Sequence, residues 1–281
     1  MRTVAVGRFS LVLEARDERL EGPLAAAFDG FTAALGGESR PLGLEVSLGL
    51  APTEGLPEQP RLALGPDGLL HDDSEGWALT LDPQQGRGVA RLRLWREDAA
   101  LLRLQLESLA RVAVATAAPY AGGLLVHGAA LIAPAGERAL LFVGASGAGK
   151  TTLARRLPAW TVLADDTVWL GRAAGAWEVA GTPFAGKERL PRSGQRAPLA
   201  AVVVLAPRLP LALEVLGPAA AFGALVGRVM GFAPGTAGAA LTWDLLAELV
   251  AARPVLRLAS RLEDDVDAPL RGLASAREYV C

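Results

Sequence analysis

The chain has 281 residues, and its 28 basic and 30 acidic side chains give a net charge of −2 at pH 7. This balance predicts no general attraction to nucleic acid or to an anionic membrane. The only cysteine, Cys281, excludes a disulfide or a cysteine-cluster zinc site within one chain. Its longest apolar runs are shorter than the roughly 20 residues that cross a bilayer, and its start does not resemble a signal peptide. We therefore expect a soluble, cytoplasmic protein with no membrane or nucleic-acid partner.

The first part of the chain predicts a mixed α+β domain over residues 1–120. Alternating or clustered apolar residues indicate strands, and apolar residues at helical spacing indicate helices. The expected strands are 4–15, 42–50, 62–64, 77–81 and 89–95, and the expected helices are 24–35 and 98–118. Residues 119–123 (PYAGG) end the second helix and form the expected domain boundary.

The remaining residues, 121–281, predict an α/β domain because strands and helices alternate along them. The expected strands are 124–132, 139–143, 161–170, 199–205 and 255–258, with a hairpin-like segment at 177–180, and the expected helices are 150–157, 219–231 and 240–252. Neither an internal repeat nor a long low-complexity tract interrupts this pattern.

The most informative motif is the segment GASGAGKT at 144–151, which fills every fixed position of the phosphate-binding pattern G-x-x-x-x-G-K-[ST]. An apolar strand precedes it and a helix follows, as the motif requires. Glycines let successive amides face one phosphate, and the helix adds the positive end of its dipole. Lys150 is expected to reach the terminal phosphates, and the Thr151 hydroxyl to ligate Mg²⁺. The predicted nucleotide-binding residues are Gly144, Ala145, Ser146, Gly147, Ala148, Gly149, Lys150, Thr151 and Thr152.

An acidic pair, Asp165 and Asp166, follows the apolar run TVLA at 161–164. A pair of this kind often only begins a solvated turn, but its position one helix after the loop favours a functional role. We expect Asp165 to share Mg²⁺ with Thr151, because Mg²⁺ takes carboxylate and hydroxyl oxygens. Asp166 could then accept a proton from an attacking hydroxyl.

Two further features leave their interpretation open. His127, in the strand before the loop strand, is either a packed core histidine or a residue of the site. Lys187, Arg189, Arg192 and Arg196 form a basic cluster downstream of the acidic pair. One of these cations could stabilise charge on the transferred phosphate, and ordinary surface charge explains the cluster equally well.

The order of His127-Gly128, the loop and the segment LADD at 163–166 resembles HPr kinase/phosphorylase. It resembles still more the shorter HPr-kinase-like proteins found among genes for ribosomally made, modified peptides. The resemblance covers about residues 124–186. It implies a P-loop fold related to phosphoenolpyruvate carboxykinase, phosphorylation of a seryl hydroxyl, a role for His127 near the active site, and a metal and acid–base pair at Asp165 and Asp166.

Three departures from the bifunctional enzymes limit what the resemblance implies. Their downstream Gly- and Arg-containing signature is absent, which puts phosphorolysis in doubt. Thr151 stands where a Ser is usual, and the first half does not resemble their N-terminal domain. Those enzymes form hexamers, so the resemblance also allows a homo-oligomer.

The sequence thus predicts an α/β protein with a P-loop kinase core preceded by a mixed α+β segment. The expected reaction is transfer of the γ-phosphate of ATP, with Mg²⁺, to a hydroxyl, with a serine of a peptide or small protein favoured as acceptor. Asp166, His127 and Lys150 are the expected catalytic residues, and Thr151 and Asp165 the metal ligands. The alternatives are a kinase of small metabolite alcohols and a nucleotide-dependent switch.

Overall fold

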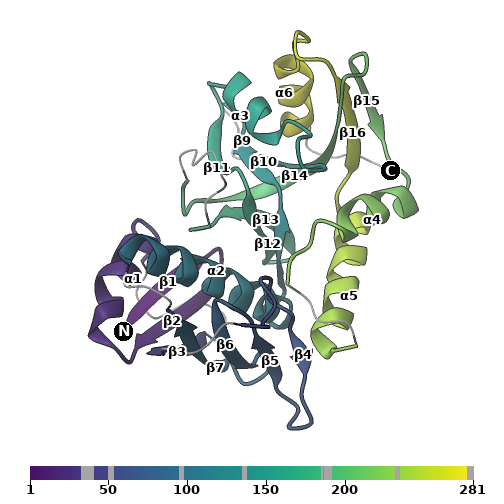
Figure 1. Cartoon of the computed structure of the whole chain (residues 1–281). Helices are drawn as coiled ribbons and strands as arrows, with labels where there is room; N and C mark the ends of the chain where they lie inside the picture. The colour runs from purple at the N-terminus through teal and green to yellow at the C-terminus, as the bar shows by residue number, and fades with distance from the viewer. Residues whose placement is uncertain are drawn as a thin grey trace. The chain divides into compact units, whose positions relative to one another are not determined.

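The computed structural model describes residues 1–32, 41–49, 54–94, 98–134, 138–184, 186, 192–231 and 235–276. Within these residues the fold is mixed α/β, as expected, with two mixed sheets and six α-helices (Figure 1). The chain divides into two compact units, Met1–Ala121 with Met230–Thr242 and Gly122–Val229 with Trp243–Cys281. No helix of the described residues is long and apolar enough to cross a membrane.

The first unit is built on a seven-stranded sheet in the order β1-β2-β3-β7-β6-β5-β4. Strands β2, β3 and β7 run parallel, and the other neighbours pair antiparallel. Helices α1 and α2 pack against each other along one side of the strands (Figure 1). The elements are β1 (Arg2–Val6), β2 (Phe9–Ala15), α1 (Glu21–Ala27), β3 (Leu42–Gly49), β4 (Ala63–Leu64), β5 (Leu70–Asp73), β6 (Trp77–Asp82), β7 (Arg87–Arg93) and α2 (Ala99–Ala117).

Two expectations for this unit are wrong. The single strand expected over 4–15 is a hairpin, because Gly7 takes the left-handed conformation (φ +61°) that reverses the chain between β1 and β2. The helix expected over 24–35 begins earlier, at Glu21, and ends at Ala27. Thr32 beyond it instead bridges to Val4 of β1, and 33–35 lie outside the described residues.

Helix α2 follows its expected bounds of 98–118 closely. The Asp98 side chain caps its start by accepting hydrogen bonds from the amides of Ala100 (2.9 Å) and Leu101 (3.2 Å). Near its end, the Thr116 hydroxyl bonds to the carbonyl oxygen of Gly231 at 3.0 Å. That contact helps to hold the returning segment Met230–Thr242 to the first unit, an association that the sequence pattern did not indicate.

The second unit is built on a nine-stranded sheet, with the path β11-β9-β10-β14-β13-β12-β8 and with β16 and β15 beyond β14. The start of the long strand β14 pairs antiparallel with β13, and the rest pairs in parallel with β10 and β16. Its strands are β8 (Gly123–His127), β9 (Ala129–Ile132), β10 (Ala139–Val143), β11 (Thr161–Ala164), β12 (Thr167–Ala173), β13 (Ala176–Gly181), β14 (Arg196–Pro207), β15 (Ala212–Val215) and β16 (Val255–Ser260). Its helices are α3 (Lys150–Arg156), α4 (Pro218–Val226), α5 (Ala237–Ala252), of which residues 237–242 are grouped with the first unit, and α6 (Asp267–Ser275).

Strand β10 is buried on both faces, which fixes the position of the loop that follows it. Leu141 and Val143 point into a core cluster shared with α4 and α5. Leu140 and Phe142 point into a second cluster shared with α3 and α6. The alternation of side chains along the strand therefore divides its apolar residues between two cores.

The strands expected over 124–132 and 161–170 are each broken in two. The first break is at Gly128, between β8 and β9, and the second is at Asp165 and Asp166, between β11 and β12. β9 pairs with β11 in one arm of the sheet, and β8 pairs with β12 in the other. The two breaks face each other, because the Gly128 amide donates to the Asp166 carbonyl oxygen at 3.0 Å.

We predict that Gly128→Ala destabilises the protein by about 1–3 kcal/mol. A Cβ on Gly128 would lie 2.8 Å from the backbone oxygen of Phe142, so β10 or the break would have to shift. Urea unfolding measures the change. Gly223→Ala in α4 is the matched control, because a Cβ there meets nothing within 4 Å and alanine favours a helix by up to about 1 kcal/mol. Equal stability of Gly128→Ala and wild type would contradict the close approach.

Candidate functional site

The loop between β10 and α3 owes its shape to its three glycines. Gly147 and Gly149 have φ of +77° and +92°, a region that residues with a side chain rarely adopt. A Cβ on Gly144 would lie 2.8 Å from the Cβ of Ala148. Gly144, Gly147 and Gly149 therefore each lie where the backbone of this loop disfavours a side chain.

Lys150, the first residue of α3, is buried with 8% of its surface exposed. Its ammonium group donates hydrogen bonds to the carbonyl oxygens of Gly144 (3.1 Å) and Ala145 (3.3 Å), which holds it against the loop. Burial lowers the pKa of Lys150 from its usual value, the charge of Arg228 lowers it further, and Asp166 opposes both. A second cation therefore lies within electrostatic reach of the loop lysine.

The acidic pair lies at the break between β11 and β12. Asp165 is 4% exposed, whereas the Asp166 carboxylate is partly open and accepts a hydrogen bond from the Thr167 hydroxyl at 3.0 Å. Thr167 is held in turn by the Thr182 hydroxyl, which donates to its carbonyl oxygen at 2.7 Å. These contacts fix the direction of the Asp166 side chain.

His127 ends strand β8 directly opposite Thr167 in the register of the sheet. Its amide donates to the Arg228 carbonyl oxygen at 2.7 Å, and its Nδ1 lies 3.5 Å from Oδ1 of Asp166. Burial lowers the pKa of His127, the charge of Lys150 lowers it further, and Asp166 raises it in part. The imidazole is therefore mainly neutral near pH 7 and able to donate one hydrogen bond and accept another.

His127, Lys150 and the acidic pair line one cavity of about 360 Å³. It brings together residues that are distant in the sequence, from β8, the loop, α3 and the β11–β12 break. Of the expected site residues, those that line it are His127, Ser146, Gly147, Gly149, Lys150, Thr151, Thr152, Asp165 and Asp166. Gly144, Ala145 and Ala148 belong to the loop without lining this cavity.

For a divalent cation, the cavity offers the Thr151 hydroxyl and the Asp165 carboxylate. Within the described part of the chain, no group of three or more His, Cys, Asp and Glu residues could form a complete metal cage. Mg²⁺ commonly takes only one or two carboxylates and completes its shell with phosphate oxygens and water. The residues present therefore fit Mg²⁺ held jointly with a phosphorylated ligand.

Three residues of the site were missed by sequence reasoning. Arg155 lines the cavity, and its position one helical turn after Thr151 could have revealed it. Gly186 also lines it, and a Cβ there would lie 2.9 Å from the Cβ of Asp166. Arg228, in the turn after α4, affects the pKa of both Lys150 and His127, but no local motif indicates it.

Of the basic cluster downstream of the acidic pair, the structure describes Arg192 and Arg196, and neither is among the residues that line this cavity. The Arg192 guanidinium donates to the Pro183 carbonyl oxygen, and Arg196 lies 3.9 Å from the carboxylate of Glu178. Lys187 and Arg189 lie outside the described residues. Among the described residues, Lys150 and Arg155 line the cavity and the charge of Arg228 acts on Lys150 and His127.

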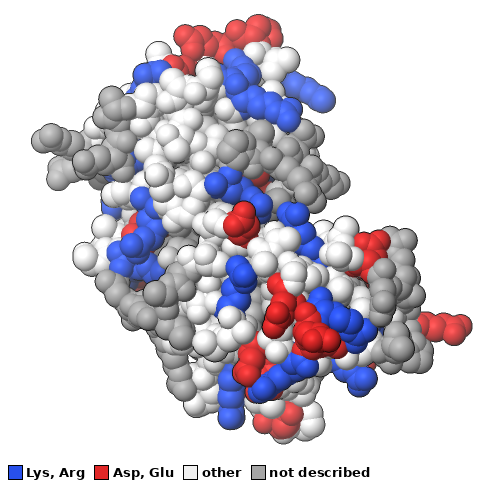
Figure 2. All heavy atoms as spheres, turned by 90° about the vertical axis from the view of Figure 1, so that its left-hand side faces the viewer, with Lys and Arg blue, Asp and Glu red and all other residues white. Residues whose placement is uncertain are grey.

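Outside the cavity, basic and acidic side chains are interspersed on the molecular face drawn in Figure 2. Exposed ion pairs of the molecule include Arg172 with Glu248 at 2.7 Å and Arg16 with Glu14 at 2.8 Å.

Comparison with known families gives one match. A family model described as SynChlorMet cassette protein ScmC matches residues 95–208. The matched segment runs from just before α2 to just past the end of β14, so it contains His127, the motif at 144–151 and both aspartates, but it covers less than half of the chain. The search of curated proteins gives no match.

We predict that His127 titrates below its usual pKa of 6.5 in the free protein, because burial and the charge of Lys150 disfavour its protonated form. The chain has only two histidines, so NMR of wild type and His71→Gln assigns the imidazole signals. Arg228→Met should raise the pKa of His127, since the guanidinium charge lowers it. A value at or above 6.5 in the free protein would contradict the described surroundings.

Proposed function

We propose that this protein is a cytoplasmic, ATP-dependent kinase that phosphorylates a hydroxyl, with serine of a peptide or small protein as the preferred acceptor. The observation that carries the proposal is the single cavity that joins a phosphate-binding loop, a basic side chain and a carboxylate pair. Lys150, Thr151, Asp165 and Asp166 all line it. The peptide acceptor and the relation to P-loop kinases rest on the sequence resemblance.

The loop residues and Lys150 would bind the phosphates of ATP. Thr151 and Asp165 would hold Mg²⁺, which neutralises phosphate charge when it is bound. Arg228 adds a further positive charge close to Lys150. Such fixed charges stabilise the phosphoryl group during transfer without a large rearrangement of the protein.

In the transfer step, the acceptor oxygen bonds to the γ-phosphorus while the bond from that phosphorus to the β–γ bridging oxygen breaks, and ADP leaves. Asp166 accepts the proton of the acceptor hydroxyl. Asp166 suits the role of proton acceptor because its carboxylate is partly exposed and is oriented by a hydrogen bond from the Thr167 hydroxyl. His127, 3.5 Å from that carboxylate, positions Asp166 or the acceptor through its neutral ring.

We predict that Asp166→Asn lowers phosphate transfer about 10²–10⁴-fold but leaves ATP binding nearly unchanged. The amide keeps the shape of the side chain but cannot accept the proton. Transfer of labelled phosphate from γ-labelled ATP to lysate peptides, followed by mass spectrometry, measures the first effect, and calorimetry measures the second. Asp244→Asn, an exposed position on α5, is the matched control. Full transfer activity in Asp166→Asn would reject its role as the base, and slow acceptor-independent hydrolysis with altered partner binding would instead favour a switch.

We further predict that Arg228→Met reduces transfer by about 10–10³-fold, because it removes positive charge from beside the phosphates. The control is Arg172→Met, which breaks only an exposed ion pair with Glu248 of little energetic value. Steady-state kinetics of both variants provides the comparison. Equal loss in the two would show a general effect of removing arginine and would contradict the role of Arg228.

A further inference from the structure

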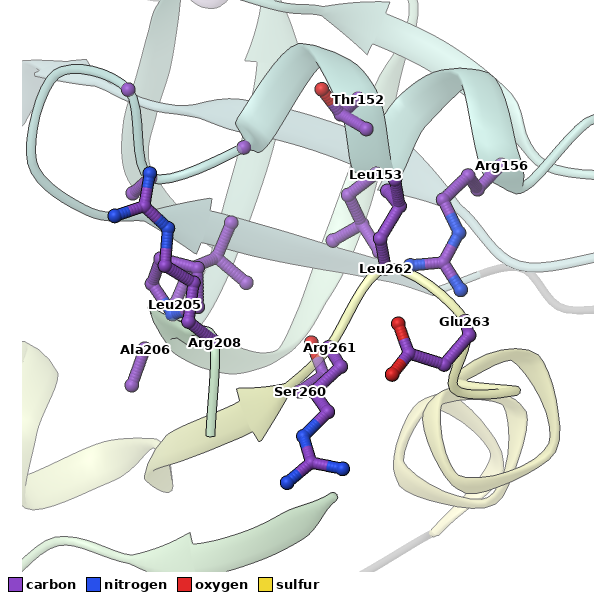
Figure 3. Close-up of a pocket in the computed structure, with 14 residues that line it drawn as sticks. Thr152, Leu153, Arg156, Leu205, Ala206, Arg208, Ser260, Arg261, Leu262 and Glu263 are labelled. Atoms are coloured by element: carbon purple, nitrogen blue, oxygen red, sulfur yellow. The ribbon is translucent and has the colours of Figure 1, made fainter. Parts of the chain in front are cut away.

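A second cavity, of about 440 Å³, borders the same phosphate loop (Figure 3). It shares Gly147, Gly149 and Thr152 with the first cavity, and its other walls come from α3 and the ends of β14 and β16. Lys150, Asp165 and Asp166 line only the first cavity. A ligand bound across the loop would therefore have one end among these charged groups and the other end in the second cavity.

The walls of the second cavity are held together by contacts between its elements. The Arg208 amide donates to the Ser260 carbonyl oxygen at 2.9 Å, which joins the ends of β14 and β16. The Arg156 guanidinium of α3 donates to the Asp264 carbonyl oxygen, and the Arg261 amide donates to the Asp264 carboxylate at 2.6 Å. The cavity is thus preformed, as small-molecule sites usually are.

The lining combines apolar surface with a few polar groups. Leu153 and Leu262 both line the cavity, and Leu262 is 68% exposed, so its side chain is open to contact with a ligand. Glu263 points its carboxylate into the cavity in Figure 3 and is the only acidic residue among those that line it. A flat heterocycle with N–H donors at its edge suits this combination.

The backbone of Arg208 also distinguishes this cavity. Its φ of +70° makes it one of two non-glycine residues with positive φ among the described residues. Such conformations are costly and occur often at ligand sites. In Figure 3 the Arg208 side chain extends from the end of β14 toward the phosphate loop, where phosphates of a nucleotide would pass.

We propose that the second cavity binds the purine nucleoside of the triphosphate and that Glu263 selects the base by accepting hydrogen bonds from its N–H groups. The proposal rests on the proposed function for the presence of a triphosphate at the loop. A carboxylate offers only acceptors, so it favours adenine, through its exocyclic amine, or guanine, through its N1–H and its amine. It disfavours a purine that lacks these donors.

Calorimetry with Mg²⁺ and four probes tests this assignment: ATP, GTP, the triphosphate of unsubstituted purine riboside, and inorganic tripolyphosphate. In wild type we expect ATP or GTP to bind most tightly and the amine-free analogue to bind roughly five-fold more weakly, the loss of about one hydrogen bond. In Glu263→Ala the preferred nucleotide should lose this advantage over the analogue. Tripolyphosphate should bind equally to wild type and Glu263→Ala.

A matched pair of leucine variants tests the cavity itself. Leu262→Ser should weaken the preferred nucleotide several-fold but not tripolyphosphate, whereas Leu64→Ser, 57% exposed in the first unit, should alter neither. Unchanged nucleotide affinity in both Leu262→Ser and Glu263→Ala, or discrimination that persists in Glu263→Ala, would overturn the nucleoside site. Failure of wild type to bind tripolyphosphate and every nucleotide would instead reject the proposed function.

Discussion

The site depends on the hydrogen bond from the Gly128 amide to the Asp166 carbonyl oxygen, which joins two strand breaks. On either side of it the chain passes from one arm of the sheet to the other, from β8 to β9 and from β11 to β12. Because these two segments of the chain change arms at the same place, His127 comes to lie beside Asp166, although 39 positions in sequence separate them. If 123–132 and 161–173 were two uninterrupted strands, successive side chains at these positions would simply alternate between the two faces of the sheet.

The two basic groups Lys150 and His127 lie close together and partly buried, which disfavours their charged forms. The pKa values of both Lys150 and His127 are lowered, first by burial and then by neighbouring positive charge. Each basic group is thus disfavoured in its charged form, and an anion bound among them would relieve that cost. Asp166 supplies some compensation, since it raises both pKa values. A polyanionic ligand such as a triphosphate therefore suits the local electrostatics better than a neutral one.

The sequence predicted the elements whose signal is local and missed those set by tertiary contacts. The α/β class, helix α2 and the glycine positions of the loop follow from neighbouring residues. The breaks at Gly128 and at the aspartates were missed because the flanking apolar residues read as one continuous strand, and only the approach of Phe142 shows why glycine is needed. Strand β15 was not expected either; it pairs antiparallel with β16, and all four of its residues are exposed.

The topology explains why the two cavities meet at one loop. Strands β10, β14 and β16 run parallel, so their carboxyl ends lie at the same edge of the sheet, where ligands of open α/β sheets commonly bind. The loop at 144–149 follows the first of these ends, and Arg208, Arg261 and Glu263 follow the other two. No spacing in the sequence links these residues, since the parallel strands require long connections between them. A motif search can therefore find the loop at 144–151, whereas the residues proposed to distinguish one nucleoside from another come together only when the strand order is known.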